Sequence, residues 1–241
     1  MVIHVYETQE QLDRAGALLI AAELLQKPES VLGLATGSSP LGIYRELESL
    51  SNDGILSFKH ASTFNLDEYI GLPAGHIESY RSFMDRNLFS RVDINMDNTH
   101  FPDVMAEDLT EASALYDQQI EESGGIDLQI LGIGTNGHIG FNEPADEFVD
   151  QTHRVRLADE TIMANSRFFE NIEDVPREAV SMGIGSIMKA KRIILIASGD
   201  AKADAIAAMV KGEVTPQLPA SILQQHDQVI VLLDQTAAAK L

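Results

Sequence analysis

Short apolar runs recur along this chain, and longer amphipathic segments separate them. The runs predict buried strands at residues 2–6, 31–35, 61–66, 128–133, 192–198 and 229–233. Most of them are continuous runs of Val, Ile and Leu, which are typical of parallel strands covered on both faces. The intervening segments repeat their apolar residues at helical spacing and predict helices at residues 9–27, 41–50, 78–90, 105–123 and 202–212.

Strands that alternate with helices predict a parallel sheet, because each crossover helix returns the chain to the same edge. No internal repeat, low-complexity tract or linker divides the sequence. We therefore expect a single Rossmann-like α/β domain over residues 1–241, with a mostly parallel sheet and helices on both faces. Residues 145–180 are more polar and less regular, and we interpret them as a helical excursion that forms a lid.

The predicted helix at residues 9–27 has clear limits. Thr8 can cap its N-terminus with the side-chain hydroxyl, and Pro28 ends it. The apolar residues that we expect on its buried face are Leu12, Ala15, Leu18, Leu19 and Ala22.

Composition narrows the classes of protein. The 241 residues are 44% hydrophobic and 22% charged, as in ordinary globular domains. The sequence has no cysteine, which excludes disulfides, thiolate nucleophiles and cysteine-based zinc sites. The first residues do not read as a signal peptide, and no apolar run reaches the ~18–20 residues that span a bilayer. We expect a cytoplasmic protein.

The formal net charge of −20 repels nucleic acid and anionic membranes, so neither is an expected partner. An anionic small molecule would need positive groups concentrated at its site. Lys202 is one candidate, because a lysine in the first turn of a helix opposes the usual preference for acids there. We interpret it as a group that serves a bound anion.

A glycine-rich loop, GIGTNGHIGFNEP at residues 132–144, follows one predicted strand. Ligands of open α/β sheets bind past the carboxyl ends of strands, and glycines let the backbone come close to them. His138 and Glu143 are the two side chains of this loop that exchange protons near neutral pH. They predict a base with its orienting carboxylate; the alternative is a surface loop with an incidental histidine.

Two further features are expected at the same edge of the sheet. The turn TGSSP at residues 36–40 precedes a helix whose N-terminal N–H groups suit an anion such as phosphate, although a plain helix cap is the alternative. It lacks the spacing of nucleotide-binding loops. Asp67 and Glu68 end the strand at residues 61–66 and are candidates for catalysis or, alternatively, solvated loop acids.

A set of motifs carries a resemblance to a known family. In chain order they are LATGSSP, FNLDEYIGL, LGIGTNGHIGFNEP, ANSRFF and ASGDAKA. Together they cover nearly the whole chain and resemble the glucosamine-6-phosphate deaminase family. The resemblance implies the reversible isomerisation and deamination of glucosamine 6-phosphate to fructose 6-phosphate and ammonia. This reaction belongs to amino-sugar catabolism, in the degradation of N-acetylglucosamine and sialic acid.

The resemblance also implies roles for individual residues. By position, Asp67 is the base that enolises the opened sugar. Asn136, His138 and Glu143 form the group that opens the sugar ring. The residues implied for binding the substrate phosphate are Thr36, Gly37, Ser38, Arg167 and Lys202. The reaction needs no metal or organic cofactor, and we expect neither.

The sequence departs from the family pattern in two ways. Many members have an aspartate in place of Asn136; if Asn136 contacts His138 directly, restoring the aspartate shifts the pH profile. Hexameric, allosteric members bind N-acetylglucosamine 6-phosphate through a serine pair and basic residues. Here those positions hold Asp146 and Glu147, and His153 and Val155. The acids repel a phosphate and the longer C-terminal tail of those members is missing, so we expect an unregulated monomer.

Two other functions remain open. A 6-phosphogluconolactonase would share the fold and a glycine–histidine loop, but that loop continues to Leu-Phe-Pro and the acidic strand end reads Asp-Glu-Arg. A non-enzymatic sugar-phosphate sensor, such as the effector domain of a sugar-operon repressor, would carry a DNA-binding helix-turn-helix. This chain starts on a strand, is strongly acidic and keeps a full set of candidate bases, which favours the deaminase.

Overall fold

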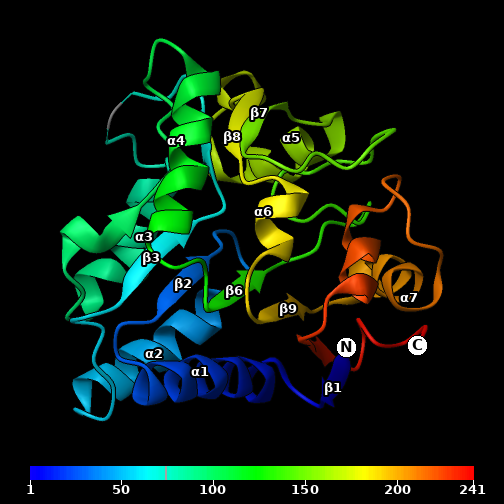
Figure 1. Ribbon diagram of the computed structural model, residues 1–241. Coiled ribbons are helices and arrows are strands. Elements are labelled where there is room, and N and C mark those ends of the chain that lie inside the picture. Colours follow the sequence, from blue (N-terminus) through cyan, green and yellow to red (C-terminus); the bar gives the residue numbers. More distant parts are fainter. Residues whose placement is uncertain (74) are drawn as a thin grey trace.

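In the computed structural model, which describes residues 1–73 and 75–241, seven strands form a parallel sheet in the order β1–β10–β9–β6–β2–β3–β5 (Figure 1). The strands are β1 Val2–Tyr6, β2 Val31–Leu34, β3 Ser62–Asn65, β5 Thr99–His100, β6 Leu128–Leu131, β9 Ile193–Ala197 and β10 Val229–Asp234. Every residue of β2, β6 and β9 is buried. The parallel sheet predicted from the apolar runs is therefore confirmed.

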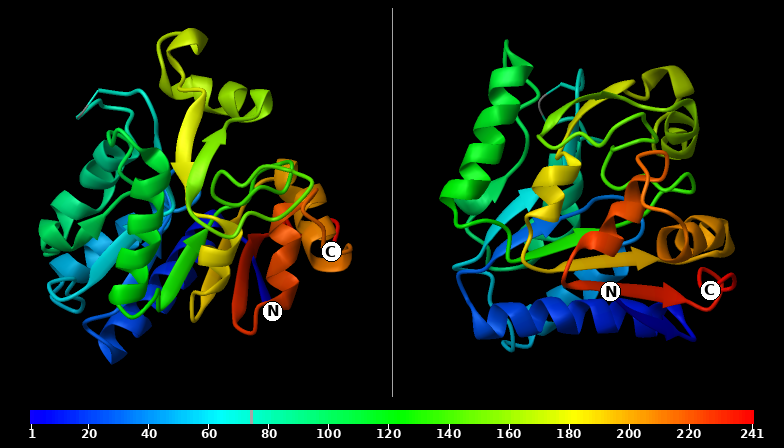
Figure 2. Two further views of the ribbon diagram at one scale, coloured as in Figure 1. Left: turned by 45° about the horizontal axis from the view of Figure 1, so that its top comes forward. Right: turned by 45° about the vertical axis from the view of Figure 1, so that its right-hand side comes forward.

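Helices cover both faces of this sheet. They are α1 Gln9–Gln26, α2 Leu41–Asn52, α3 Tyr80–Asn87, α4 Leu109–Glu122, α5 Asp159–Asn165, α6 Ile184–Met188 and α7 Ala203–Lys211. In both views α1 and α2 lie against one face, whereas α4 and α6 lie on the opposite side (Figures 1 and 2). Within the described ranges, no helix is long and apolar enough to cross a membrane.

Helix α1 begins as predicted, but its buried face is different. The Thr8 hydroxyl accepts a hydrogen bond from the N–H of Gln11 at 3.2 Å. The predicted face was only partly right: Leu12 is buried, but Leu18 is 54% exposed, and the buried positions also include Gly16 and Ile20. The middle of the helix, residues 15–22, contains only Ala, Gly, Leu and Ile, so spacing alone did not select a face there. Close packing does: a Cβ at Gly16 would lie 2.3 Å from the end of Ile43 in α2.

A second, smaller sheet was not predicted. Its antiparallel strands lie in the order β4 Asp67–Tyr69, β8 Glu178–Ser181 and β7 His153–Arg156, and Figure 2 shows β7 and β8 rising above the main sheet. The helical interpretation of residues 145–180 was thus only partly right, since α5 and the 3-10 turns η3 Ser166–Phe168 and η4 Ile172–Asp174 lie between two strands. Strand β7 alternates half-buried and exposed residues, and three of its four residues are polar or charged, so no apolar run marks it.

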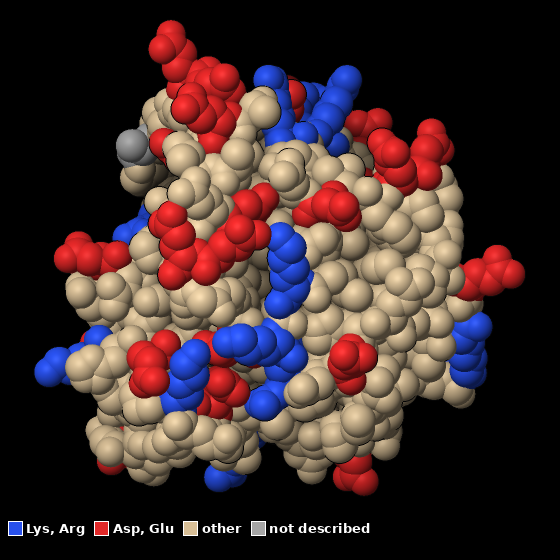
Figure 3. All heavy atoms as spheres, viewed as in Figure 1, with Lys and Arg blue, Asp and Glu red and all other residues tan. Residues whose placement is uncertain are grey.

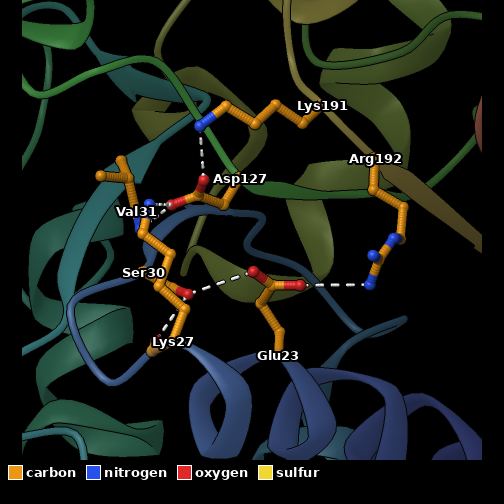
Figure 4. A network of polar contacts seen from close by, with 7 residues as sticks. All are labelled: Glu23, Lys27, Ser30, Val31, Asp127, Lys191 and Arg192. Atoms are coloured by element: carbon orange, nitrogen blue, oxygen red, sulfur yellow. Dashed lines mark hydrogen bonds and ion pairs between the residues drawn. The ribbon is translucent and has the colours of Figure 1, made fainter.

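The amino-terminal ends of β2, β6 and β9 are joined by a polar network, drawn in Figure 4. Asp127 accepts hydrogen bonds from the Lys27 and Lys191 ammonium groups, both at 2.7 Å, and from the N–H of Val31 at 2.8 Å. On the face seen in Figure 3, acidic side chains are widely spread, and basic ones gather over this edge of the sheet. The network therefore ties together three segments that are distant in sequence.

Candidate active site

The candidate site lies where the sheet reverses its winding. From β2 the chain adds β3 and β5 on one side, and from the neighbouring β6 it adds β9 and β10 on the other. The loops that follow such a pair of strands diverge and leave a crevice at their carboxyl ends. A cavity of about 230 Å³ opens here. The predicted residues that line it are Thr36, Gly37, Ser38, Asp67, Asn136, His138, Arg167 and Lys202.

Asp67 was expected at the end of the strand at residues 61–66, but it begins a separate short strand, β4, just after β3. Strand β4 pairs with β8, and the residue opposite Asp67 is Ser181. The Asp67 residue is 6% exposed, and the described residues donate no hydrogen bond to its carboxylate. Burial, with a smaller contribution from the charge of Glu68, raises the pKa of Asp67 to about 8. A carboxyl group in this state is a competent base near neutral pH.

Glu68, the neighbouring acid, is engaged in holding the structure. Its carboxylate accepts hydrogen bonds from the N–H groups of Tyr69, Tyr80 and Arg81 at 2.8 to 2.9 Å. Two of these groups belong to the first turn of α3, whose N–H groups have no partner within the helix. The two neighbouring acids therefore have different roles: Asp67 faces the cavity, and Glu68 anchors α3.

Glu143 lies behind His138 and is contacted from three sides. One carboxylate oxygen, Oε2, lies 3.3 Å from Nδ1 of His138 and accepts a hydrogen bond from the Asn136 amide at 2.7 Å. The other, Oε1, accepts from the Thr161 hydroxyl at 2.5 Å. Burial opposes ionisation, but the His138, Thr161 and Asn136 contacts outweigh it and lower the pKa of Glu143 to about 2. Glu143 is therefore an ionised group that faces the imidazole.

The amide of Asn136 does not meet the ring of His138 in the part of the chain that the structure describes. Its Nδ2 donates to Glu143, and its Oδ1 accepts from the backbone N–H of His138 at 3.2 Å. Asn136 therefore acts on His138 through the carboxylate and the backbone, which corrects the direct contact considered from the sequence.

Glycines bring the loop close to both acid–base groups. A Cβ at Gly134 would lie 2.3 Å from Cε1 of His138, so the imidazole packs directly on the backbone there. Gly140 has a positive φ of 57°, and a Cβ on it would lie 3.1 Å from the Ser181 hydroxyl and 3.7 Å from Oδ2 of Asp67. Gly134 therefore lets the imidazole pack on the loop backbone, and Gly140 holds a backbone conformation that favours glycine where the loop approaches Ser181 and Asp67.

Four segments form the cationic part of the cavity: the turn after β2, the N-terminus of α2, and the segments that carry Arg167 and Lys202. The turn after β2 has Gly37 at a positive φ of 86° and leads to α2, whose N-terminus has no side-chain cap. Arg167 donates to the Ser38 hydroxyl at 3.4 Å. Lys202 ends a 3-10 turn, η5 Asp200–Lys202, just before α7; burial and then the Arg167 charge lower its pKa. Two cations held near each other at an uncapped helix N-terminus suit a phosphate.

Sequence reasoning missed three residues that line the cavity. Tyr80 of α3 donates from its hydroxyl to the Tyr69 hydroxyl at 3.1 Å, and the Asn165 amide donates to the same Tyr69 hydroxyl at 2.8 Å. Thr161 is the third. Asn165 lies within the ANSRFF motif, which was a usable signal. Tyr80 and Thr161 sit in ordinary amphipathic helices, so the sequence held no sign of their role.

The arrangement is suited to proton transfer on a small anionic molecule. A buried carboxyl group and an imidazole–carboxylate pair line one cavity, and the cations stand at another part of its wall. In residues 1–73 and 75–241, no cluster of three or more His, Asp or Glu is placed to hold a metal ion. These residues best fit a phosphorylated small molecule from which the carboxyl group and the imidazole can remove protons.

Comparison with known sequences supports this description. The family model for glucosamine-6-phosphate isomerases and 6-phosphogluconolactonase matches residues 7–232. A relative named glucosamine-6-phosphate deaminase from Clostridioides difficile (strain 630) is 50% identical over 241 residues, which are 100% of this chain and 97% of the relative. Another of the same name, from Alkaliphilus oremlandii (strain OhILAs), is 49% identical over 100% of both chains.

Solved structures agree with these relationships. A monomeric glucosamine-6-phosphate deaminase matches with a TM-score of 0.97 and 41% identity over 100% of both chains. A 6-phosphogluconolactonase from Thermotoga maritima matches with a TM-score of 0.76 and 19% identity over 97% of this chain and 99% of that one, which shows a shared fold. By its matched length and its relatives, this chain belongs to the family of glucosamine-6-phosphate isomerases and 6-phosphogluconolactonase.

Proposed function

We propose that the chain converts glucosamine 6-phosphate reversibly to fructose 6-phosphate and ammonia. The observation that carries the proposal is the shared cavity. A buried carboxyl group with a raised pKa, an imidazole beside an ionised carboxylate, and a pair of cations all line it or support its wall. The relatives named for this reaction, about half identical over nearly their whole length, support the same conclusion.

Ring opening is assigned to His138. The cyclic sugar hides its aldehyde, so the anomeric hydroxyl must lose a proton and the ring oxygen must gain one. An imidazole can accept the first proton and deliver the second, because it is both acid and base near neutral pH. Glu143, 3.3 Å away, orients the ring and supports its charged form, and Asn136 holds Glu143 in place.

Isomerisation is assigned to Asp67. The opened amino sugar carries an acidic proton on C2, and the Asp67 carboxylate removes it to form an enolamine. The same proton is then delivered to C1, so the C2 amine becomes a fructosimine. Water adds to that C=N bond and ammonia leaves, which gives fructose 6-phosphate. A raised pKa makes Asp67 both a stronger base and a ready donor in this transfer.

The phosphate serves as a handle far from the reacting carbons. Thr36, Gly37 and Ser38 offer the backbone and hydroxyl groups of the turn, and Arg167 and Lys202 supply the charge. Binding energy from this end fixes C1 and C2 against the bases, which is how a remote group accelerates a reaction. Burial, and then the charge of Arg167, lower the pKa of Lys202, and a bound phosphate would offset both effects by favouring the charged ammonium group.

The first experiment measures ammonia release from glucosamine 6-phosphate by the wild type and by Asp67→Asn. Release by the wild type that is lost in the variant supports both the reaction and the base. Hydrolysis of 6-phosphogluconolactone in place of ammonia release would replace the proposal with a lactonase. Saturable sugar-phosphate binding without any turnover would replace it with a sensor.

We extend the proposal to regulation, with the chain as an unregulated monomer. The monomeric relative with a TM-score of 0.97 supports this, and so do the exposed acids Asp146 and Glu147 at positions where a phosphate effector would bind. Sedimentation equilibrium should give a mass near 26.3 kDa. A sigmoidal rate curve that N-acetylglucosamine 6-phosphate makes hyperbolic would contradict the proposal.

A further inference from the structure

The two oxygens of the Glu143 carboxylate have different hydrogen-bond partners. Oε2 faces His138 Nδ1 and also accepts from Asn136. Oε1 accepts from the Thr161 hydroxyl, the one described donor to that oxygen. The Glu143 side chain is only 14% exposed, so water replaces a lost donor poorly. Without the hydroxyl, the described contacts of the carboxylate would all be at Oε2, from Asn136 and His138, and the Oε1 side would lose its anchor.

Thr161 does not belong to the loop that it supports. It lies on α5, between β7 and β8, whereas Glu143 follows β6 in sequence. The same segment supplies Asn165, which donates to the Tyr69 hydroxyl, and Arg167, which donates to the Ser38 hydroxyl. The segment from Thr161 to Arg167 is therefore coupled to Glu143, to Tyr69 of β4 and to the turn after β2.

We propose that Thr161 is a positioning residue for ring opening: its hydroxyl fixes the Glu143 carboxylate against His138 and makes that arrangement depend on where α5 lies. The proposal rests on the proposed function, because it assigns a consequence to the ring-opening group. Thr161 itself remains a hydrogen-bond donor throughout and exchanges no proton with the substrate. Its effect passes through Glu143 to the imidazole.

The test compares Thr161→Val, which keeps the shape and removes the donor, with Thr161→Ser, which keeps the donor. Thr152→Val is the matched control, since the Thr152 hydroxyl also donates to a partly buried carboxylate, that of Asp117 at 2.6 Å, outside the cavity. We expect Thr161→Val to lower kcat about tenfold, the effect of losing one hydrogen bond to a charged group. Thr161→Ser and Thr152→Val should stay within about twofold of wild type.

Binding of glucitol 6-phosphate, an open-chain sugar phosphate with no ring to open, separates positioning from general damage. Its inhibition constant should change less than about twofold in Thr161→Val. The inference fails if Thr161→Val keeps the wild-type kcat, if Thr161→Ser is equally impaired, or if glucitol 6-phosphate binding weakens in parallel with kcat.

A second measurement does not depend on turnover. The ring ¹⁵N chemical shifts of His138, assigned by comparison with His138→Gln, should move in Thr161→Val and stay unchanged in Thr152→Val. Unchanged shifts in both variants would overturn the inference. Wild-type protein that releases no ammonia would instead refute the proposed function, and the ¹⁵N shifts would still decide whether Thr161 positions Glu143 against His138.

Discussion

Two buried aspartates lie beyond opposite edges of the main sheet: Asp127 directly before β6, and Asp67 on β4 of the second sheet, which follows β3. Their hydrogen-bond surroundings differ. Asp127, 5% exposed, begins the approach to β6 and accepts hydrogen bonds from two lysines and a backbone N–H. Asp67, 6% exposed, lies past β3 and receives no hydrogen bond from the described residues. Burial favours the protonated form of both. At Asp127 the donors outweigh burial and lower the pKa, whereas burial prevails and raises the pKa of Asp67 to about 8.

The difference separates a carboxylate that stabilises the fold from one that is available for chemistry. Asp127 sits at the amino-terminal edge of the strands, where it joins α1, β2, β6 and β9 (Figure 4). Asp67 sits at the carboxyl edge, beside the cavity. A base must keep its lone pairs free of strong hydrogen-bond donors. Asp67 is therefore buried without such donors, which destabilises its ionised form, whereas the donors around Asp127 stabilise its carboxylate.

Of the substitutions considered, Asp67→Asn should lower kcat the most. An amide cannot remove the C2 proton, so we expect kcat to fall about 10³-fold, within the range for loss of a general base. The measurement is ammonia release from glucosamine 6-phosphate at saturating substrate. A variant with more than a tenth of the wild-type kcat would exclude Asp67 as the base.

Asp127→Asn should affect stability and leave kcat within about twofold. The neutral amide loses the attraction of two lysines, but Lys27 and Lys191 have side-chain exposures of 38% and 58%, so solvent screens much of it. We expect a loss of about 2 kcal/mol and a Tm lower by about 5 °C. Calorimetry measures both. Lys189→Gln, which breaks an exposed ion pair with Glu121, is the control and should leave Tm unchanged.

The two aspartates should also give stability opposite dependences on pH. The folded pKa of Asp127 lies below its unfolded value, so its contribution is present above that value and lost as pH falls through the folded pKa. The folded pKa of Asp67 is raised, so its contribution is present below pH about 4 and lost as pH rises toward 8. Asp67→Asn should therefore stabilise the fold at pH 8 by on the order of 5 kcal/mol.

Denaturant unfolding of wild type and Asp67→Asn at pH 5 and pH 8 measures this effect. A gain that is equal at both pH values would contradict the raised pKa. The pH dependence of activity should show the same pKa. As pH drops below about 8, Asp67 of the free enzyme becomes protonated, so kcat/KM should fall tenfold per pH unit.

Asn136→Asp should have the smallest effect when the effects on activity and stability are compared as free energies. The new carboxylate would lie beside Glu143, which now receives a hydrogen bond from Asn136 at 2.7 Å, and like charges raise each other's pKa. We expect the pKa of Glu143 to rise and the acid limb of the pH–rate profile to shift, with kcat changed about threefold. An identical profile would show that the charge of this side chain does not reach the ring-opening group.

The sequence was most informative about the strands and the edge at which they end. Runs such as residues 192–198 lie in parallel strands, and the loops after such strands must meet at one edge. Thr36, Asp67, His138 and Lys202 could therefore be assigned to one cavity without coordinates. The motif resemblance supplied their roles, which remain predictions for each residue, and the family that it named is confirmed.

The tertiary structure alone decided which contacts reach between distant segments. Periodicity could not show that α1 buries Gly16 against Ile43, because residues 15–22 in the middle of the helix are all apolar or glycine. It could not show that Asp67 lies on a strand of a second sheet, since its partner β8 comes more than a hundred residues later. Nor could it separate Asp67 from Asp127, two acids at strand ends. Their different pKa values depend on donors from other segments, and a sequence pattern records only local spacing.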